Sequence, residues 1–297
     1  MRVAAIFGPG ASSKDLLPFQ SARDATWLSG LPATSSEADA ILILGGDGTV
    51  HRHLAALVEL QLPVLVVPCG SGNDFARALG LRAARASLAA WRKFQSGAGN
   101  VWAIDLGVIT PVEKSGTIST HYFCCVGGVG IDREVARRAN RLPGWWRANG
   151  GYALSVLPAV FQFTPIPMKI QFPSDEPKEF PTRNSQPAVL ATFANAPAYG
   201  GGMKIAPRAR FDDGKLDVCF IRDINKLKLL CLLPTVYFGR HLGISEVEYL
   251  QTEQLRLETA SPCEVYADGE YICQTPVAVS VQRKALQVIV PSLQTAV

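Results

Sequence analysis

Residues 42–50 read Leu-Ile-Leu-Gly-Gly-Asp-Gly-Thr-Val, an apolar run that ends in a glycine-rich turn. The apolar residues predict a buried strand over residues 40–44, and residues 50–60 have the apolar spacing of a helix. Backbone N–H groups at a strand-to-helix turn, together with the helix dipole, form a site for anions such as phosphate. A tight turn without a ligand is the alternative, but Asp47 within the turn favours a magnesium ion between its carboxylate and a phosphate.

The same arrangement recurs after the next apolar run. Residues 64–67 predict a second strand, and residues 67–76 read Val-Pro-Cys-Gly-Ser-Gly-Asn-Asp-Phe-Ala. Asp74 begins a predicted helix, where a carboxylate can also act as an ordinary N-cap. Two such loops on adjacent parallel strands meet at the carboxyl edge of the sheet, which is where open α/β sheets bind ligands. The two loops together therefore predict one phosphate-binding site.

The remaining residues around these loops alternate between strand and helix patterns. A further strand is predicted at residues 3–7, and the predicted helices are residues 19–28, 50–60, 74–79 and 87–94. This β-α-β series predicts a doubly wound α/β domain over residues 1–100, which would bind the nucleotide.

Residues 101–297 have a different pattern, in which short strands follow one another between Pro- and Gly-rich turns. The predicted strands are residues 101–109, 117–126, 188–195, 216–221 and 248–257, with more up to residue 290. Helices are predicted only at residues 132–140 and 226–233. We therefore expect an antiparallel β-sandwich domain over residues 101–297.

The composition narrows the class of protein. Of the 297 residues, 48% are hydrophobic and 18% are charged, as in compact folded domains. The net charge of +4 is too small to indicate a nucleic-acid partner, and no apolar run reaches the roughly 18 residues of a transmembrane helix. The seven cysteines form no C-x-x-C pair, which favours reduced core residues of a cytoplasmic protein over a disulfide framework.

The two glycine loops together resemble the diacylglycerol kinase catalytic domain, which bacterial lipid kinases and sphingosine kinases share. The resemblance rests on residues 45–49 (Gly-Gly-Asp-Gly-Thr) and residues 68–77 (Pro-Cys-Gly-Ser-Gly-Asn-Asp-Phe-Ala-Arg). NAD kinases share the first motif, whereas the second is similar to the lipid branch. Residues 195–202, 212–218 and 267–270 continue the resemblance, so that it covers nearly the whole chain.

The resemblance implies a lipid kinase that transfers the γ-phosphoryl group of ATP to the hydroxyl of diacylglycerol or a related lipid. It implies an active site in the cleft between the two domains, with Glu270 as the general base and Asp268 beside it. It places Asp47 and Asp74 in the network around a catalytic Mg²⁺ and the phosphates. The expected nucleotide-binding residues are Gly45, Gly46, Asp47, Gly48, Thr49, Gly70, Ser71 and Asn73.

Two of these assignments have simpler alternatives. Residues 265–272 read as a hairpin with an Asp-Gly turn, in which Glu270 at the tip could be merely solvated. The family resemblance also implies a structural Mg²⁺ held by the side chain of Asp213 and the carbonyl oxygens of Arg210 and Lys215. Hard oxygen ligands suit magnesium, but an ordinary Asp-Gly turn before a strand would have the same sequence.

A lipid substrate implies contact with a membrane surface. Arginines surround a pair of tryptophans between residues 133 and 147, namely Arg133, Arg137, Arg138, Arg141 and Arg147 with Trp145 and Trp146. Such a cluster suits an interface of anionic headgroups, although a solvated helix face is the simpler reading. We expect a cytoplasmic enzyme that visits the membrane transiently.

The chain also departs from the family pattern. Gly8-Pro9 stands where Asn-Pro is usual, His51-Arg52 replaces Asn-Glu or His-Glu, and residues 12–37 form a short segment. These differences concern the nucleotide side. Two alternatives therefore remain, which are an NAD kinase-like enzyme and a non-catalytic nucleotide or lipid sensor of the same fold.

Overall fold

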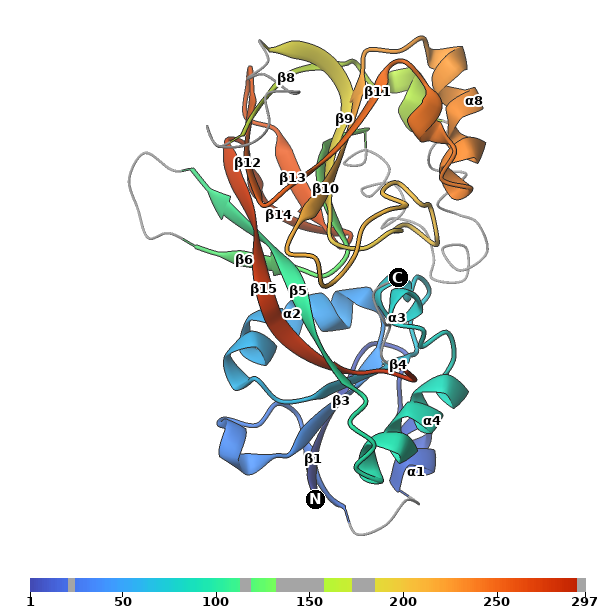
Figure 1. The fold of residues 1–297 in the computed structure, drawn as a ribbon, viewed down its shortest axis with the longest axis vertical. Helices are drawn as coiled ribbons and strands as arrows, with labels where there is room; N and C mark the ends of the chain where they lie inside the picture. Colours follow the sequence, from blue (N-terminus) through green and yellow to red (C-terminus); the bar gives the residue numbers. More distant parts are fainter. Residues whose placement is uncertain (21–24, 113–118, 132–157, 173–184, 293–297) are drawn as a thin grey trace. The chain divides into compact units, whose positions relative to one another are not determined.

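The computed structural model describes residues 1–20, 25–112, 119–131, 158–172 and 185–292. These residues divide into two compact units (Figure 1). Unit 1 contains the residues up to Asp105 together with those from Arg283 onward, and unit 2 contains those between Leu106 and Gln282. No helix among the residues described is long and apolar enough to cross a membrane.

Two long strands connect the units. The chain leaves unit 1 within β5 (Val101–Pro111) and returns within β15 (Val277–Ile289). The sequence-based division assigned everything after residue 100 to one domain, whereas the structure returns the C-terminal segment to unit 1. The reason is strand pairing, because β15 pairs in parallel with β4 (Val64–Pro68), where Val288 lies opposite Val64.

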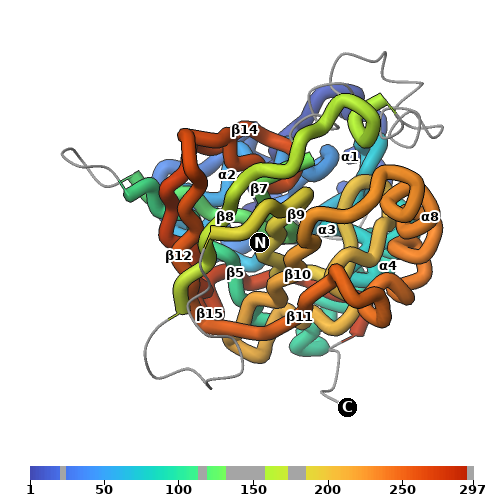
Figure 2. The backbone as a smooth tube through the Cα atoms, turned by 90° about the horizontal axis from the view of Figure 1, so that it is seen from above, coloured from blue at the N-terminus to red at the C-terminus, as the bar shows by residue number. Residues whose placement is uncertain are grey.

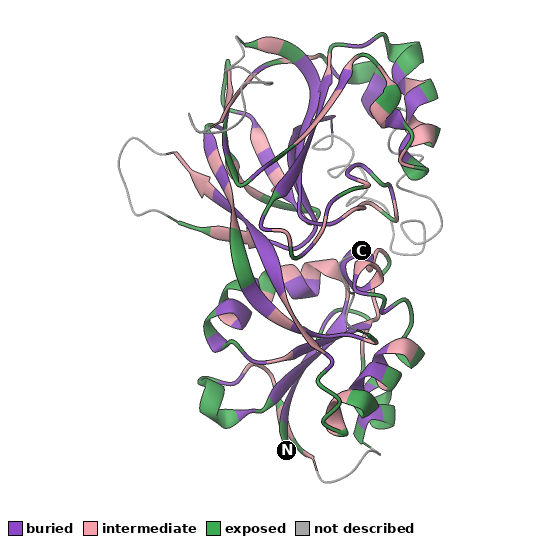
Figure 3. Ribbon diagram, viewed as in Figure 1, coloured by how far each residue is buried: buried purple, intermediate pink, exposed green. Residues whose placement is uncertain are grey.

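Unit 1 is a parallel sheet with helices, as the alternating sequence predicts. Its elements are β1 (Arg2–Phe7), α1 (Ser13–Gln20), β2 (Thr26–Ser29), η1 (Ser35–Glu37), β3 (Ala40–Gly45), α2 (Asp47–Leu60), β4 (Val64–Pro68), α3 (Asp74–Ala78) and α4 (Ala84–Gln95). The strand order is β2-β1-β3-β4-β15, and each of these neighbours is parallel. Every residue of β3 is buried, as Figure 3 shows in purple, which explains its uninterrupted apolar run.

One element of unit 1 differs from the sequence prediction. The helix expected at residues 19–28 is wrong, because α1 ends at Gln20 and residues 26–29 form β2. Trp27 of β2 lies opposite Val3 of β1. Pairing with the edge of the sheet therefore decides the conformation of a segment whose apolar spacing is helical.

Unit 2 is dominated by antiparallel strands. Its elements are β6 (His121–Phe123), β7 (Val126–Gly130), β8 (Ile166–Gln171), β9 (Gln186–Ala194), β10 (Leu216–Arg222), α8 (Lys226–Tyr237), η2 (His241–Gly243), β11 (Val247–Thr252), β12 (Gln254–Thr259), β13 (Glu264–Ala267) and β14 (Glu270–Gln274). Strand β9 pairs with β7, β8 and β10, and Figure 2 shows β8, β9 and β10 side by side. The predicted strand over residues 248–257 is two strands, since Glu253 separates β11 from β12.

The core of unit 2 lies between its strands. Phe123 and Phe193 are fully buried and meet edge to face, with ring centroids 5.7 Å apart. Two glycines make room for these rings. A Cβ at Gly107 would lie 1.9 Å from the Phe123 ring, and a Cβ at Gly127 would lie 2.3 Å from the Phe193 ring. The parallel sheet of unit 1 and the antiparallel strands of unit 2 confirm the predicted fold class, an N-terminal α/β domain followed by a β-sandwich.

Candidate functional site

The two glycine loops of unit 1 touch each other. Gly46 follows β3 and Gly70 follows β4, which are adjacent parallel strands. A Cβ added to Gly70 would lie 2.6 Å from the Cα of Gly46, and one added to Gly46 would lie 3.0 Å from the Cα of Gly70. Glycine is therefore required here by loop-to-loop packing, a reason that the sequence did not reveal.

Asp47 joins the two loops through its carboxylate. Oδ2 accepts a hydrogen bond from the amide of Asp74 at 3.0 Å, and Oδ1 accepts one from the amide of Phe75 at 3.0 Å. A Cβ at Gly72 would lie 2.8 Å from Oδ2, so that glycine permits the approach. Each carboxylate oxygen can accept a second hydrogen bond or coordinate a cation. Asp47 thus fits a magnesium site while it also fixes the second loop.

Gly46 is the N-cap of α2 and offers no side chain to cap that helix. The amides of Thr49 and Val50 donate to the carbonyl oxygen of Gly46 at 2.9 and 3.2 Å. The preceding amides, those of Asp47 and Gly48, belong to the first turn, where a helix lacks intrahelical acceptors. Such an N-terminus is suited to a phosphate group. The nucleotide-binding role of Gly46, Asp47 and Gly48 stays a prediction.

Thr49 lies against glycines on both sides and is only 5% exposed. A Cβ at Gly8 would lie 2.1 Å from the Thr49 hydroxyl oxygen, and one at Gly45 would lie 2.6 Å from it. The unusual Gly8 of the sequence is thereby explained, because a larger residue would collide with Thr49. The buried position also argues for a packing role of Thr49 beside any nucleotide contact.

The second loop is held by its own side chains. Asn73 accepts a hydrogen bond from the Gly70 amide at 2.9 Å and donates to the Gly70 carbonyl oxygen at 2.6 Å. Asp74 is 8% exposed and lies 3.5 Å from the guanidinium of Arg77, which also donates to the carbonyl oxygen of Gly72. Ser71 is exposed at the tip of this loop.

In unit 2, the predicted hairpin around residue 268 is confirmed. Strands β13 and β14 are antiparallel, and Ala267 lies opposite Glu270. The two turn residues between them, Asp268 and Gly269, have φ values of 51° and 86°. Two successive positive φ values are typical of a type I′ turn. Glu270 begins β14 and is exposed.

Asp268 is bound by main-chain amides. Its Oδ2 accepts from the amide of Cys124 and its Oδ1 from the amide of Cys125, both at 2.8 Å. Its own amide donates to the carbonyl oxygen of Val126 at 3.0 Å. The side chain of Asn195 donates to the carbonyl oxygen of Cys124 at 3.1 Å. Asp268 therefore anchors the turn that carries Glu270, a role that the sequence did not reveal.

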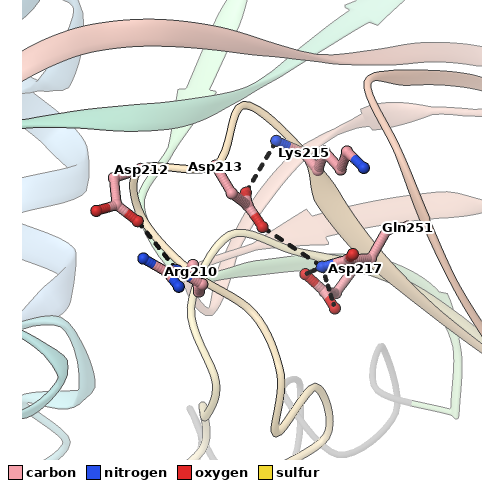
Figure 4. Close-up of polar contacts among 6 residues, drawn as sticks. All are labelled: Arg210, Asp212, Asp213, Lys215, Asp217 and Gln251. Carbon is pink, nitrogen blue, oxygen red and sulfur yellow. Dashed lines mark hydrogen bonds and ion pairs between the residues drawn. The ribbon is translucent and has the colours of Figure 1, made fainter. Parts of the chain in front are cut away.

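The loop expected to hold a structural metal lies elsewhere in unit 2 (Figure 4). Asp213 accepts a hydrogen bond from the Lys215 amide at 3.0 Å, and Gln251 lies 3.4 Å from its other oxygen. Gln251 also contacts Asp217, which accepts a hydrogen bond from the Tyr249 hydroxyl at 2.5 Å. Burial raises the pKa of the Asp217 carboxyl, although the hydrogen bonds from Tyr249 and Gln251 act in the opposite direction.

The expected metal ligands Arg210, Asp213 and Lys215 all lie in this loop. The two oxygens of Asp213 lie near the Lys215 amide and the Gln251 side chain, and a carboxylate oxygen can accept more than one interaction. Main-chain carbonyls such as those of Arg210 and Lys215 are hard donors of the type that magnesium uses. The side chain of Arg210 forms an ion pair with Asp212 at 3.2 Å. Among the described residues, no group of three or more His, Cys, Asp or Glu could hold a metal ion.

The predicted membrane cluster, Arg133 to Arg147 with Trp145 and Trp146, lies outside the described residues.

Comparisons with known proteins identify the family. The model of the diacylglycerol kinase catalytic domain matches residues 15–109, and that of the YegS C-terminal NAD kinase beta sandwich-like domain matches residues 126–290. A diacylglycerol kinase from Mycobacterium tuberculosis is 32% identical over 268 residues, which are 87% of this chain and 79% of that protein. The chain belongs to the diacylglycerol kinase family.

Two further proteins similar to this lipid kinase are also described as diacylglycerol kinases. A diacylglycerol kinase from Bacillus subtilis is 25% identical over 241 residues, covering 80% of this chain and 73% of that protein. A solved structure described as a diacylglycerol kinase from Bacillus anthracis str. Sterne has a TM-score of 0.66 at 20% identity, covering 97% of this chain and 96% of that one. This last likeness shows the shared fold.

Proposed function

We propose that this lipid kinase transfers the γ-phosphoryl group of ATP to the hydroxyl of diacylglycerol or a related lipid. The observation that carries the proposal is the contact between Gly46 and Gly70 with Asp47 joining the two loops. That arrangement combines an uncapped helix N-terminus with a carboxylate, the combination that a magnesium-bound phosphate requires.

In unit 1, the proposed nucleotide site consists of both loops. The phosphates would contact main-chain amides of the first turn of α2, and Ser71 is exposed and available for a further contact. Asp47 and Asp74 would hold Mg²⁺, which when bound neutralises charge on the transferring phosphoryl group. The hydrogen bonds between the loops keep these groups in place before the substrate binds, so that little rearrangement is needed.

In unit 2, Glu270 is the proposed general base. Its carboxylate is exposed and so accessible to a substrate hydroxyl. An alcohol has a pKa far above 7, so that a base which accepts its proton as the new O–P bond forms lowers the barrier. Asp268 is the proposed positioning residue, since its two amide contacts fix the turn from which Glu270 begins β14.

The loop of residues 210–215 is the proposed site of a structural Mg²⁺. The ligands would be the Asp213 side chain and the carbonyl oxygens of Arg210 and Lys215. The hydrogen bond from the Lys215 amide to Asp213 supports this proposal, because it holds the Asp213 carboxylate next to the main chain of Lys215. The cation would stabilise unit 2 and take no part in the transfer.

A radiolabelled ATP assay over a lipid panel tests the proposal. Wild-type protein should place the label in a lipid extract, and Glu270→Gln should lower the rate by roughly 10²- to 10⁴-fold without weakening ATP binding. Glu253→Gln is the matched control, since Glu253 is another exposed glutamate of unit 2. Full activity of Glu270→Gln would refute the assignment of the base.

Two other outcomes would favour the alternatives. Label that appears in NADP and in no lipid would indicate an NAD kinase-like activity. ATP binding with no transfer to any acceptor would indicate a sensor.

A further inference from the structure

Helix α8 of unit 2 has an exposed apolar face. Leu227, Cys231, Pro234 and Phe238 follow one another at intervals of four, three and four residues, so that they lie on one side of the helix. All four are exposed, Leu227 at 68% and Phe238 at 72%. We call these four residues the α8 stripe. Exposed apolar side chains that are contiguous in this way are typical of surfaces that bind a protein or a membrane.

The opposite face of α8 already makes the contacts that hold the helix. Leu229, Leu232 and Val236 are buried, and Figure 3 shows the alternation of purple and green along α8. An ordinary surface helix is polar on its second face. Helix α8 is apolar on both faces, but only the face with Leu229, Leu232 and Val236 is buried within unit 2.

A neighbouring segment extends the exposed surface. The Lys226 ammonium donates to the carbonyl oxygen of Phe161 at 2.6 Å, which places the short helical segment of residues 158–162 at the start of α8 (Figure 1). Phe161 is itself 53% exposed. Aromatic rings therefore lie at both ends of the surface, with Phe238 at the other end.

Basic residues lie near both ends of the α8 stripe. Lys226 and Lys228 begin α8, and the helix contains no Asp or Glu. At its C-terminal end, the amide of Lys204 donates to Val236 and that of Arg240 to Thr235, at 3.1 and 2.9 Å.

Only Lys228 among these four basic residues forms an ion pair in the part of the chain that the structure describes. Lys228 pairs with Glu246, whereas Lys204, Lys226 and Arg240 form no ion pair among the described residues. Asp223, three residues before the helix, is exposed. The surface as a whole is apolar with a positive border.

We infer that the α8 stripe and Phe161 dock onto an anionic membrane surface. Leucine and phenylalanine side chains enter the boundary between headgroups and acyl chains, while lysine and arginine at the border contact anionic lipid headgroups. The inference rests on the proposed function in so far as a lipid substrate requires contact with a bilayer. The residues of the docking surface all belong to unit 2, and none of the arginines between residues 133 and 147 is among them.

The charges favour a membrane over a second copy of the chain. In a symmetric dimer the same patch would face itself, which would bring the cations at each end toward like charges. An anionic bilayer instead offers opposite charge to all of them.

Vesicle co-sedimentation of the full chain tests the inference. Wild-type protein should bind vesicles of phosphatidylcholine with phosphatidylglycerol, and should bind more weakly to phosphatidylcholine alone and at high salt. The double variant Leu227→Ser with Phe238→Ser should partition roughly tenfold or more weakly. The triple variant Lys204→Gln, Lys226→Gln and Arg240→Gln should lose about fivefold per cation on the anionic vesicles only.

Matched variants in unit 1 serve as controls. Leu17→Ser removes another exposed leucine (59%, against 68% for Leu227), and Arg82→Gln, Arg85→Gln and Arg92→Gln together remove three exposed arginines. Both should leave vesicle binding unchanged. Circular dichroism verifies that every variant remains folded, and the triple charge variant tests the surface even where the double variant does not fold.

The outcomes separate docking from the proposed function. Phosphorylation of dispersed dioctanoylglycerol should be equal in wild type and both α8 variants. Vesicle binding that depends on α8 without any lipid phosphorylation would retain docking and refute the kinase proposal. The inference is overturned by wild-type protein that does not bind vesicles, or by α8 variants that bind within twofold of wild type. It is equally overturned by a wild-type dimer that the double variant dissociates while vesicle binding persists.

Discussion

Substitution of Gly70 by alanine tests the contact between the two glycine loops. The new Cβ would lie 2.6 Å from the Cα of Gly46 and 3.0 Å from Oδ1 of Asn73. Carbon atoms pack at roughly 3.5–4.0 Å, so that the loops must separate by about 1 Å. The backbone of Gly70 is not in the left-handed region, and the predicted effect is therefore one of packing alone.

The separation should affect both stability and activity. Overpacking of this kind costs about 1–3 kcal/mol of unfolding free energy. The same displacement would move the hydrogen bonds that Asp47 accepts from the second loop, and misplacement by about 1 Å can lower a rate by roughly 10²-fold. We expect Gly70→Ala to unfold at a lower temperature and to lose about two orders of magnitude in kcat/KM for ATP.

Thermal unfolding and steady-state kinetics measure these two effects. Gly243→Ala is the control, since a Cβ at that glycine meets no atom within 4 Å and its φ is not positive. If Gly70→Ala matches Gly243→Ala in unfolding temperature and in kcat/KM, the two loops do not form one rigid site.

Three further predictions concern unit 2. Asp268→Asn should lower the unfolding free energy by about 1–3 kcal/mol, because one of the two amides of residues 124–125 would lose its acceptor. Denaturant titration measures this loss, and Glu270→Gln should show no comparable loss of unfolding free energy. Burial lowers the pKa of His241, so that the unfolded chain binds its proton more readily and stability is lost as the pH falls below about 6.5. Wild type should therefore lose up to about 1.4 kcal/mol per pH unit more than His241→Asn, and parallel pH profiles would contradict this. Added Mg²⁺ should raise the unfolding temperature of wild type but not of Asp213→Asn, and an equal rise in both would exclude Asp213 as a ligand.

The sequence was sufficient to predict an element where the local residue pattern and the strand pairing favour the same structure. The apolar runs of β1, β3 and β4 are buried on both faces, so that their composition alone identified them. The Asp-Gly pair at residues 268–269 determined a hairpin because few other residues adopt two successive positive φ values. The two glycine motifs indicated the family that the comparisons show.

Contacts between distant residues were decided only by the tertiary structure. Residues 26–29 form a strand because an edge of the sheet is available to them, which no local spacing encodes. The requirement for Gly8 arises from Thr49, and the amides that bind Asp268 come from residues 124–125, far along the chain. The sequence likewise did not predict the exposed apolar face of α8, because an apolar residue type does not show whether its side chain is buried in the folded protein. The free energy of such a contact depends on both partners, and the sequence names each partner without bringing them together.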